Sequence, residues 1–300
     1  MGRRPEMRYR VRHTTTYEYA DSVDIASHML HLSPRVLAAQ SVVSSGMTIE
    51  PRGGRRRDGI DYFGNPVSWL FLDAPHDRFT VTAEAVVDVA FPAPPASSMA
   101  WEDVAAAALS AEGQAPAEGR AGEFTFPSPM LARDAAAREY AALSFPPGRP
   151  VLEGLLDLNA RIRQDFAFRP GVTGISTSVA TVMRQRAGVC QDFTHLMIAG
   201  LRGLGLAARY VSGYLRTRPP PGKAPRRGAD QSHAWVQAWL GPGQGWVGLD
   251  PTNALVVKDE HVVLAWGRDY GDISPVRGVI LGGGKHAVSV SVDLEPWEVV

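Results

Sequence analysis

The chain contains a single cysteine, Cys190, among its 300 residues. Cys190 follows Gly188-Val189 and precedes apolar residues with helical spacing, so we expect it at the start of a helix. A helix N-terminus favours a thiolate through its dipole, and its free N–H groups can stabilise an oxyanion. The other interpretation is a buried, inert cysteine, and placement alone does not decide between the two.

A cysteine nucleophile needs a base, and His233 is the histidine with the best-placed partner. It opens an expected strand at 233–240, and the next expected strand, 245–250, ends at Asp250. A two-residue loop between the strands puts His233 directly opposite Asp250, and a four-residue loop puts them one diagonal step apart. Both side chains share a face in either case. A hairpin ion pair without a catalytic role is the competing interpretation.

Other histidines have weaker claims to a catalytic role. His195 lies five residues after Cys190, and five helical residues turn it about 140° away, so we expect a structural role. His28 and His31 form a His-x-x-His pair without a third ligand nearby. One cysteine excludes an intrachain disulfide and any zinc site that needs two cysteines from this chain. We therefore expect no metal and no cofactor.

The charge balance limits the possible partners. Lys and Arg number 31 and Asp and Glu number 31, so the formal net charge is zero. Arginines cluster at 8–12, 52–57 and 216–227, but bulk charge argues against nucleic acid and against an anionic membrane. No apolar run approaches the roughly 18 residues of a membrane span, and the N-terminus lacks the apolar region of a secretory signal. We expect a cytoplasmic protein with no nucleic-acid or membrane partner, in an undetermined oligomeric state.

The elements that must position these residues fall into two halves. At about 150 residues per domain, the length predicts two domains. Period-two alternation at 7–19 and 79–89 predicts strands, and we assign 1–95 to a β-rich, sandwich-like N-terminal domain. Proline, alanine and glycine are frequent over 96–150, which predicts a linker with short helices.

We assign the rest of the chain, 151–300, to the catalytic domain. Helical spacing occurs at 151–166 and again after Cys190, and antiparallel strands are expected to follow. Helices followed by a run of strands indicate an α+β fold rather than alternating βαβ units.

Four stretches around the candidate residues resemble the transglutaminase-like (transglutaminase core) superfamily. They are 188–193, 207–214, 232–236 and 245–252. The first hundred residues resemble the β-rich domain that precedes this core in many bacterial proteins, some of which are regarded as cysteine proteases. The stretch at 267–275 resembles the ending of that subfamily.

The resemblance implies a papain-like α+β core with a Cys–His–Asp triad. By position, Cys190 is the nucleophile, His233 the base and Asp250 the residue that orients it. In this superfamily the cysteine attacks a carboxamide or peptide carbonyl and forms a thioester, which water or an amine then resolves. We expect cysteine-dependent acyl transfer on a protein or peptide substrate, with hydrolysis first and amine transfer second. The alternative is a binding or scaffold protein that keeps the core without the chemistry.

The nucleophile motif departs from that of the animal transglutaminases. Those enzymes resemble Gly-Gln-Cys-Trp at this point and use an upstream tryptophan for the oxyanion. Here the motif is Gly188-Val189-Cys190-Gln191, and no tryptophan lies between Trp101 and Trp235. The sequence therefore leaves the second oxyanion donor and any substrate-binding residues unassigned, and calcium-dependent cross-linking is not implied.

Overall fold

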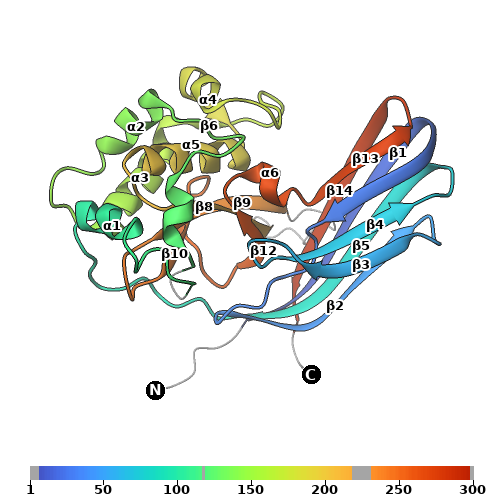
Figure 1. Ribbon diagram of the computed structural model, residues 1–300, viewed down its shortest axis with the longest axis horizontal. Coiled ribbons are helices and arrows are strands. Elements are labelled where there is room, and N and C mark those ends of the chain that lie inside the picture. The colour runs from blue at the N-terminus through green and yellow to red at the C-terminus, as the bar shows by residue number, and fades with distance from the viewer. Residues whose placement is uncertain (1–6, 117–118, 218–230, 298–300) are drawn as a thin grey trace, which may run out of the picture.

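The computed structural model describes residues 7–116, 119–217 and 231–297 (Figure 1). A 7-stranded sheet stands beside a 5-stranded sheet, and most of the helices gather around the smaller sheet. Within the described residues, no helix combines the length and apolar character needed to cross a membrane.

The larger sheet is built on β1 (Met7–Leu30). Tyr9 and Val11 are buried, whereas Arg10 and Arg12 point to the opposite face and are exposed. This alternation confirms the strand predicted over 7–19, because side chains in a strand alternate between the two faces of a sheet. The strand continues 11 residues beyond the predicted stretch, to Leu30.

The strands of the larger sheet follow the order β2-β5-β1-β4-β3. Their bounds are Gln40–Glu50 for β2, His76–Val89 for β5, Pro66–Leu72 for β4 and Arg55–Ile60 for β3. β5 pairs mainly with the first half of β1 and β4 with the second half, with an irregularity in register after Glu18. One face of this sheet carries an apolar cluster that includes Phe79 of β5, Leu70 of β4 and Leu30 of β1. The N-terminal region is thus β-rich, but its strands form one sheet rather than the two of the expected sandwich.

The last two strands of the chain join this same sheet. β13 (Val276–Gly282) and β14 (His286–Pro296) both pair antiparallel with β1. The expected division at 151–300 therefore does not follow the sheets, since the larger sheet takes strands from both ends of the chain. A strand has hydrogen-bonding groups on both edges, and the same residues of β1 that pair with β5 and β4 also pair with β14 and β13.

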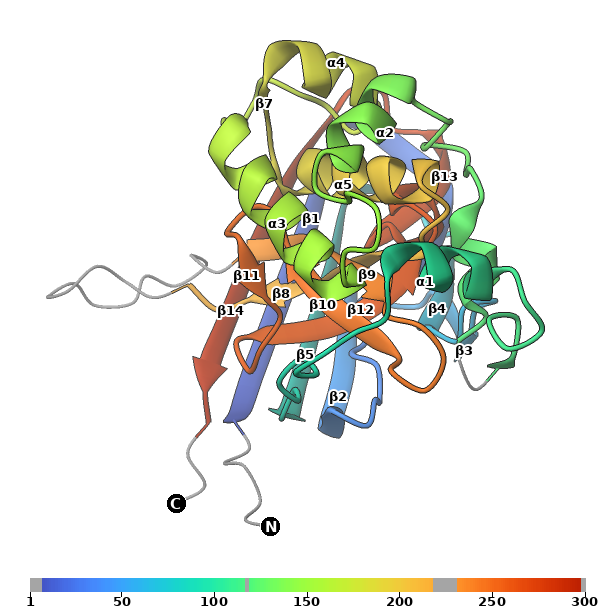
Figure 2. The ribbon, with the colours of Figure 1, turned by 90° about the vertical axis from the view of Figure 1, so that its left-hand side faces the viewer.

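The smaller sheet and its helices form the α+β core. The strand order is β11-β10-β9-β8-β12, with all pairs antiparallel. The bounds are Leu255–Val256 for β11, Trp246–Asp250 for β10, Gln231–Trp239 for β9, Ala208–Leu215 for β8 and His261–Gly267 for β12. α5 (Cys190–Gly203) packs on β8 and β9, while α3 (Val151–Asp165) and α4 (Val179–Gln185) pack on α5 (Figure 2).

The segment 96–150 is part of this core rather than a linker. It forms α1 (Trp101–Ala108), a 3-10 turn (Ala121–Thr125) and α2 (Ala135–Ala142). Val104, Phe124 and Tyr140 are buried in the main apolar cluster. Alanine and glycine here allow close packing: a Cβ on Gly200 of α5 would lie 2.8 Å from the Cβ of Ala141 of α2. The composition that suggested a spacer is therefore that of a tight helix interface.

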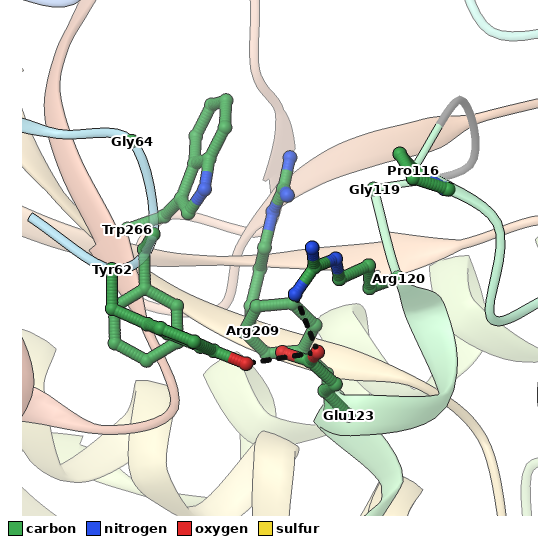
Figure 3. Close-up of a pocket in the computed structure, with 10 residues that line it drawn as sticks. Tyr62, Gly64, Pro116, Gly119, Arg120, Glu123, Arg209 and Trp266 are labelled. Atoms are coloured by element: carbon green, nitrogen blue, oxygen red, sulfur yellow. Dashed lines mark hydrogen bonds and ion pairs between the residues drawn. The ribbon is translucent and has the colours of Figure 1, made fainter.

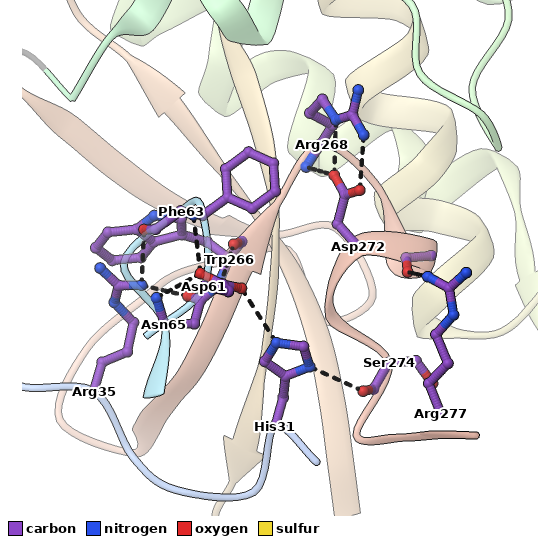
Figure 4. A network of polar contacts seen from close by, with 11 residues as sticks. His31, Arg35, Asp61, Phe63, Asn65, Trp266, Arg268, Asp272, Ser274 and Arg277 are labelled. Carbon is purple, nitrogen blue, oxygen red and sulfur yellow. Dashed lines mark hydrogen bonds and ion pairs between the residues drawn. The ribbon is translucent and has the colours of Figure 1, made fainter. Parts of the chain in front are cut away.

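Buried hydrogen bonds join the two sheets (Figure 4). The fully buried Asn65, in the turn between β3 and β4, donates to the carbonyl of Trp266 at 2.8 Å and accepts from its N–H at 2.9 Å. His31 directly follows β1. Its ring lies 3.2 Å from the carboxylate of Asp61 and 3.3 Å from the carbonyl oxygen of Ser274. The larger sheet is therefore attached to β12 and to the chain that leads into β13.

Candidate active site

Cys190 is the first residue of α5, as the sequence predicts. The side chain of Asp192 accepts from the N–H of Val189 at 2.8 Å and from the hydroxyl of Thr173 at 2.6 Å, which fixes the approach to the helix. A Cβ on Gly188 would lie 2.7 Å from the Asp192 carboxylate, so this geometry requires glycine. The half-buried Cys190 faces a cleft of about 790 Å³.

His233 and Asp250 meet in the manner of the four-residue-loop alternative. Trp246 pairs with Trp239, a register that places Asp250 one diagonal step from His233 on the same face. The Nε2 atom of His233 lies 2.8 Å from the Oδ2 atom of Asp250. Cys190 and His233 line the same cleft, and the interaction with Cys190 contributes to a raised pKa of His233. Two of the three residues singled out in the sequence, Cys190 and His233, therefore line one cleft, and the third, Asp250, is bonded to His233.

The carboxylate of Asp250 is fully buried and well supplied with donors. Its Oδ1 atom accepts from the N–H groups of Thr252 at 3.0 Å and Asn253 at 3.3 Å, and its Oδ2 atom accepts from the Asn253 amide at 2.7 Å. Burial alone raises the pKa of Asp250, but His233, His261 and Asn253 outweigh it and hold that pKa well below its usual range. Asp250 is therefore a permanent anion.

The same contacts act in the opposite direction on His233. Burial lowers the pKa of His233, but hydrogen bonds to Asp250 and Cys190 and their negative charges raise it to about 10. The ring is therefore cationic at neutral pH and shares the cleft with the Cys190 side chain. A neighbouring cation favours the thiolate, which is the nucleophilic form of cysteine.

His261 and Asn253 belong to the site, although the sequence did not single them out. The Nε2 atom of His261 lies 3.7 Å from the Asp250 carboxylate, an ion-pair distance too long for a hydrogen bond. His261 is buried and meets the Trp235 ring edge-on at 5.2 Å. It begins β12, three strands from β10 in the sheet, so no local spacing indicates it. Asn253 could have been found from the sequence, because it lies three residues after Asp250 in an expected turn.

The remaining histidines have structural surroundings. His195 accepts from the N–H of Tyr270 at 3.2 Å, and burial lowers its pKa to about 4, so it is neutral. His28 stacks on Phe79 with ring centres 4.4 Å apart, whereas His31 binds Asp61, and the pair does not converge. In the described ranges, no group of three His, Cys, Asp or Glu side chains could hold a metal ion.

Comparison with known proteins identifies the class to which this fold and site belong. Residues 9–88 match the bacterial transglutaminase-like N-terminal region, and residues 144–251 match the transglutaminase-like superfamily. The chain belongs to the transglutaminase-like superfamily, with the bacterial N-terminal region and a papain-like core.

Particular relatives and a solved structure resemble nearly the whole chain. An uncharacterized protein of Mycobacterium tuberculosis is 43% identical, covering 97% of this chain and 93% of its own. An uncharacterized protein of Mycobacterium leprae is 33% identical, over 96% of this chain and 98% of its own length. A crystal structure described as "a Putative Cysteine Protease" from Cytophaga hutchinsonii shares the fold with a TM-score of 0.72 at 19% identity, over 99% of this chain and 93% of that one.

Proposed function

We propose that the protein is a cysteine-dependent enzyme that cleaves an amide or peptide bond through a thioester at Cys190. The observation that carries the proposal is that Cys190, at the start of α5, shares one cleft with His233, which is bonded to Asp250. A nucleophile, a base and a carboxylate that orients the base are the parts that acyl transfer by cysteine requires. Membership of the transglutaminase-like superfamily supports the same chemistry.

The reaction follows from these positions. His233 holds the thiol proton, and the sulfur of Cys190 attacks the carbonyl carbon while the carbonyl oxygen takes the negative charge. When the tetrahedral intermediate collapses, the C–N bond breaks and His233 gives its proton to the leaving amine. Water, activated by the now neutral His233, attacks the thioester and releases the acid and the thiol. Asp250 holds the ring in orientation throughout.

Two groups are placed to stabilise the oxyanion. The N–H of Cys190, in the first turn of α5, has no partner within the helix. Tyr210 lines the same cleft, and its side chain is only 2% exposed. Burial, followed by negative charge at Cys190, raises the pKa of Tyr210 well above its usual value, so it remains a neutral donor. We propose Tyr210 as the second oxyanion donor.

Hydrolysis is the outcome we favour over amine transfer. The Cytophaga hutchinsonii protein that shares this fold is described as a cysteine protease, which supports water as the acceptor. An amine that entered the cleft would attack the same thioester, so the acceptor decides the product.

The test is incubation with a peptide library and a labelled primary amine, followed by mass spectrometry. Cleaved peptides without label indicate hydrolysis, and labelled peptides indicate transferase activity. The Cys190→Ala variant is the matched control and must give neither product. If the wild-type protein gives neither product and Cys190 reacts with iodoacetamide no faster than a free thiol does, the enzyme proposal is wrong.

A further inference from the structure

The larger sheet forms one wall of the catalytic cleft. Tyr17 pairs with Val288, Thr15 with Val290 and His13 with Val292. Residues directly opposite each other in an antiparallel pair point to the same face of the sheet. All six line the cleft that also contains Cys190 and His233. Strands from both ends of the chain thus build this wall, and its most exposed side chains are those of Val288 and Val290.

The most exposed part of this wall is apolar, and none of its six residues is Asp, Glu, Lys or Arg. Val288 is 49% exposed and Val290 is 54% exposed, so two branched side chains lie open to the cleft. His13 is neutral because burial lowers its pKa to about 4. The charged residues of β1 point to the other face, where Arg10 and Arg12 each lie 3.7 Å from a carboxylate oxygen of Glu84.

The cleft as a whole carries few charges. Among its described lining residues there is no Asp, Glu, Lys or Arg, so the cleft offers a charged substrate side chain no carboxylate, ammonium or guanidinium partner. A charged substrate side chain placed against Val290 would lose water without gaining a partner, which is unfavourable. An apolar side chain there would instead cover exposed apolar surface.

The wall is held in place before any substrate binds. Besides Asn65, the buried side chain of Gln40 donates to the carbonyl of Val263 at 2.8 Å and accepts from its N–H at 2.8 Å. These bonds tie β2 of the larger sheet to β12 of the smaller one. A wall that is fixed to the catalytic core can select substrates with little loss of conformational entropy.

We propose that the β1–β14 wall is the substrate-recognition surface and that it binds an uncharged, apolar side chain next to the scissile amide. The occupant is the acyl-donor peptide, because the wall belongs to the cleft that holds the nucleophile. The inference rests on Cys190 being that nucleophile, and it assigns to the N-terminal region the selection of substrate. Leucine, valine and phenylalanine side chains fit this surface, whereas aspartate and lysine do not.

The test compares rates of Cys190 alkylation by the chloromethyl ketones of acetyl-leucine, acetyl-aspartate and acetyl-lysine, each divided by the rate with iodoacetamide. For the wild-type protein we expect the leucine reagent to react at least tenfold faster than either charged one. Val290→Asp should abolish the preference for leucine over lysine. Val290→Lys should bring a gain in the aspartate rate, which misfolding could not produce. Equal wild-type rates, or an unchanged preference in both variants, would overturn the proposal.

A matched control and a separate readout keep the result specific. Val279→Asp changes a valine that is 78% exposed on β13 and outside the cleft lining, so its preference should equal that of the wild type. A loss of preference in Val279→Asp would show that the wall is not the determinant. Because the reagents need no amide turnover, a leucine preference without peptide cleavage would contradict the proposed function and leave the recognition surface standing.

Discussion

Two cavities touch the smaller sheet, and they differ in how their polar groups are used. Arg209 and Tyr210 are neighbours on β8 and point to opposite faces. Tyr210 faces the cleft of about 790 Å³ at Cys190, and Arg209 faces a pocket of about 260 Å³ (Figure 3). The two sites therefore share a strand but not a face.

In the smaller pocket, polar groups are paired with one another. Arg120 lies 3.4 Å from Glu123, which also accepts from the hydroxyl of Tyr62 at 3.1 Å (Figure 3). Arg209 donates to the side chain of Gln237 at 2.8 Å, and its guanidinium lies 3.7 Å from the centre of the Trp266 ring. These contacts serve the fold.

The cleft, by contrast, is lined by Cys190 and His233 together with the exposed apolar side chains of Val288 and Val290. Paired groups indicate structure, and groups aimed at an open cleft indicate chemistry. Variants in the two cavities should therefore have different consequences.

The largest effect should come from Cys190→Ala. Removing a catalytic nucleophile lowers kcat on the order of 10⁵–10⁶-fold. Because Cys190 is half-buried and small, the midpoint of thermal unfolding should stay within about 2 °C of the wild type. Peptide cleavage assays and thermal melts measure both quantities. Retained cleavage in Cys190→Ala would show that Cys190 is not the nucleophile.

Asp250→Asn should be next in size. The change keeps the shape of the side chain but removes the charge that orients and stabilises the protonated His233 ring. We expect kcat to fall roughly 10³–10⁴-fold, as for the carboxylate of other triads. The kinetic measurement should be accompanied by a melt, because a fall in stability alone would indicate a structural ion pair.

Tyr210→Phe tests the second oxyanion donor. Losing one such donor lowers kcat by about 10²-fold with little change in KM, because the hydrogen bond strengthens in the transition state. An increase in KM with unchanged kcat would instead show that Tyr210 only packs against the substrate.

The pH dependence should follow the raised pKa of His233. Cleavage needs the protonated ring, so kcat/KM should fall tenfold per pH unit above about pH 10. The folded-state pKa lies above the ordinary value of 6.5, so the protonated ring stabilises the fold fully below pH 6.5. That stability is lost as the pH rises from 6.5 through about 10. Urea unfolding across this range should show the decline, and Asp250→Asn should flatten it.

The smallest effect is expected in the other pocket. Arg120→Ala removes an exposed ion pair, and such pairs contribute little to stability. Cleavage rates should remain within twofold of the wild type. A large loss of activity would show that the smaller pocket takes part in catalysis, and the two cavities would then not differ in role.

The catalytic group was predictable because its geometry is largely local. A helix start is visible at Cys190, and hairpin register alone brings His233 to Asp250. The choice between the two loop lengths required the structure, as did the position of His261, which approaches Asp250 to 3.7 Å from a distant strand.

The recognition wall could not be predicted for the opposite reason. The alternation over 286–293 indicates a strand but not the sheet that it joins, and pairing with β1 is a contact across nearly the whole chain. Likewise, the composition of 96–150 resembles a linker until Ala141 is seen against Gly200. In both cases the missing information is tertiary packing, which overrides local preference.

The central claim is that Cys190 forms a thioester with an amide-derived acyl group. The most direct measurement is the intact mass of the protein, quenched in acid within milliseconds of mixing with an apolar peptide amide. We predict a mass increase equal to the acyl group, located on the peptide that contains Cys190 and removed by hydroxylamine. Peptide turnover without any such adduct, or the same adduct in Cys190→Ala, would contradict the account.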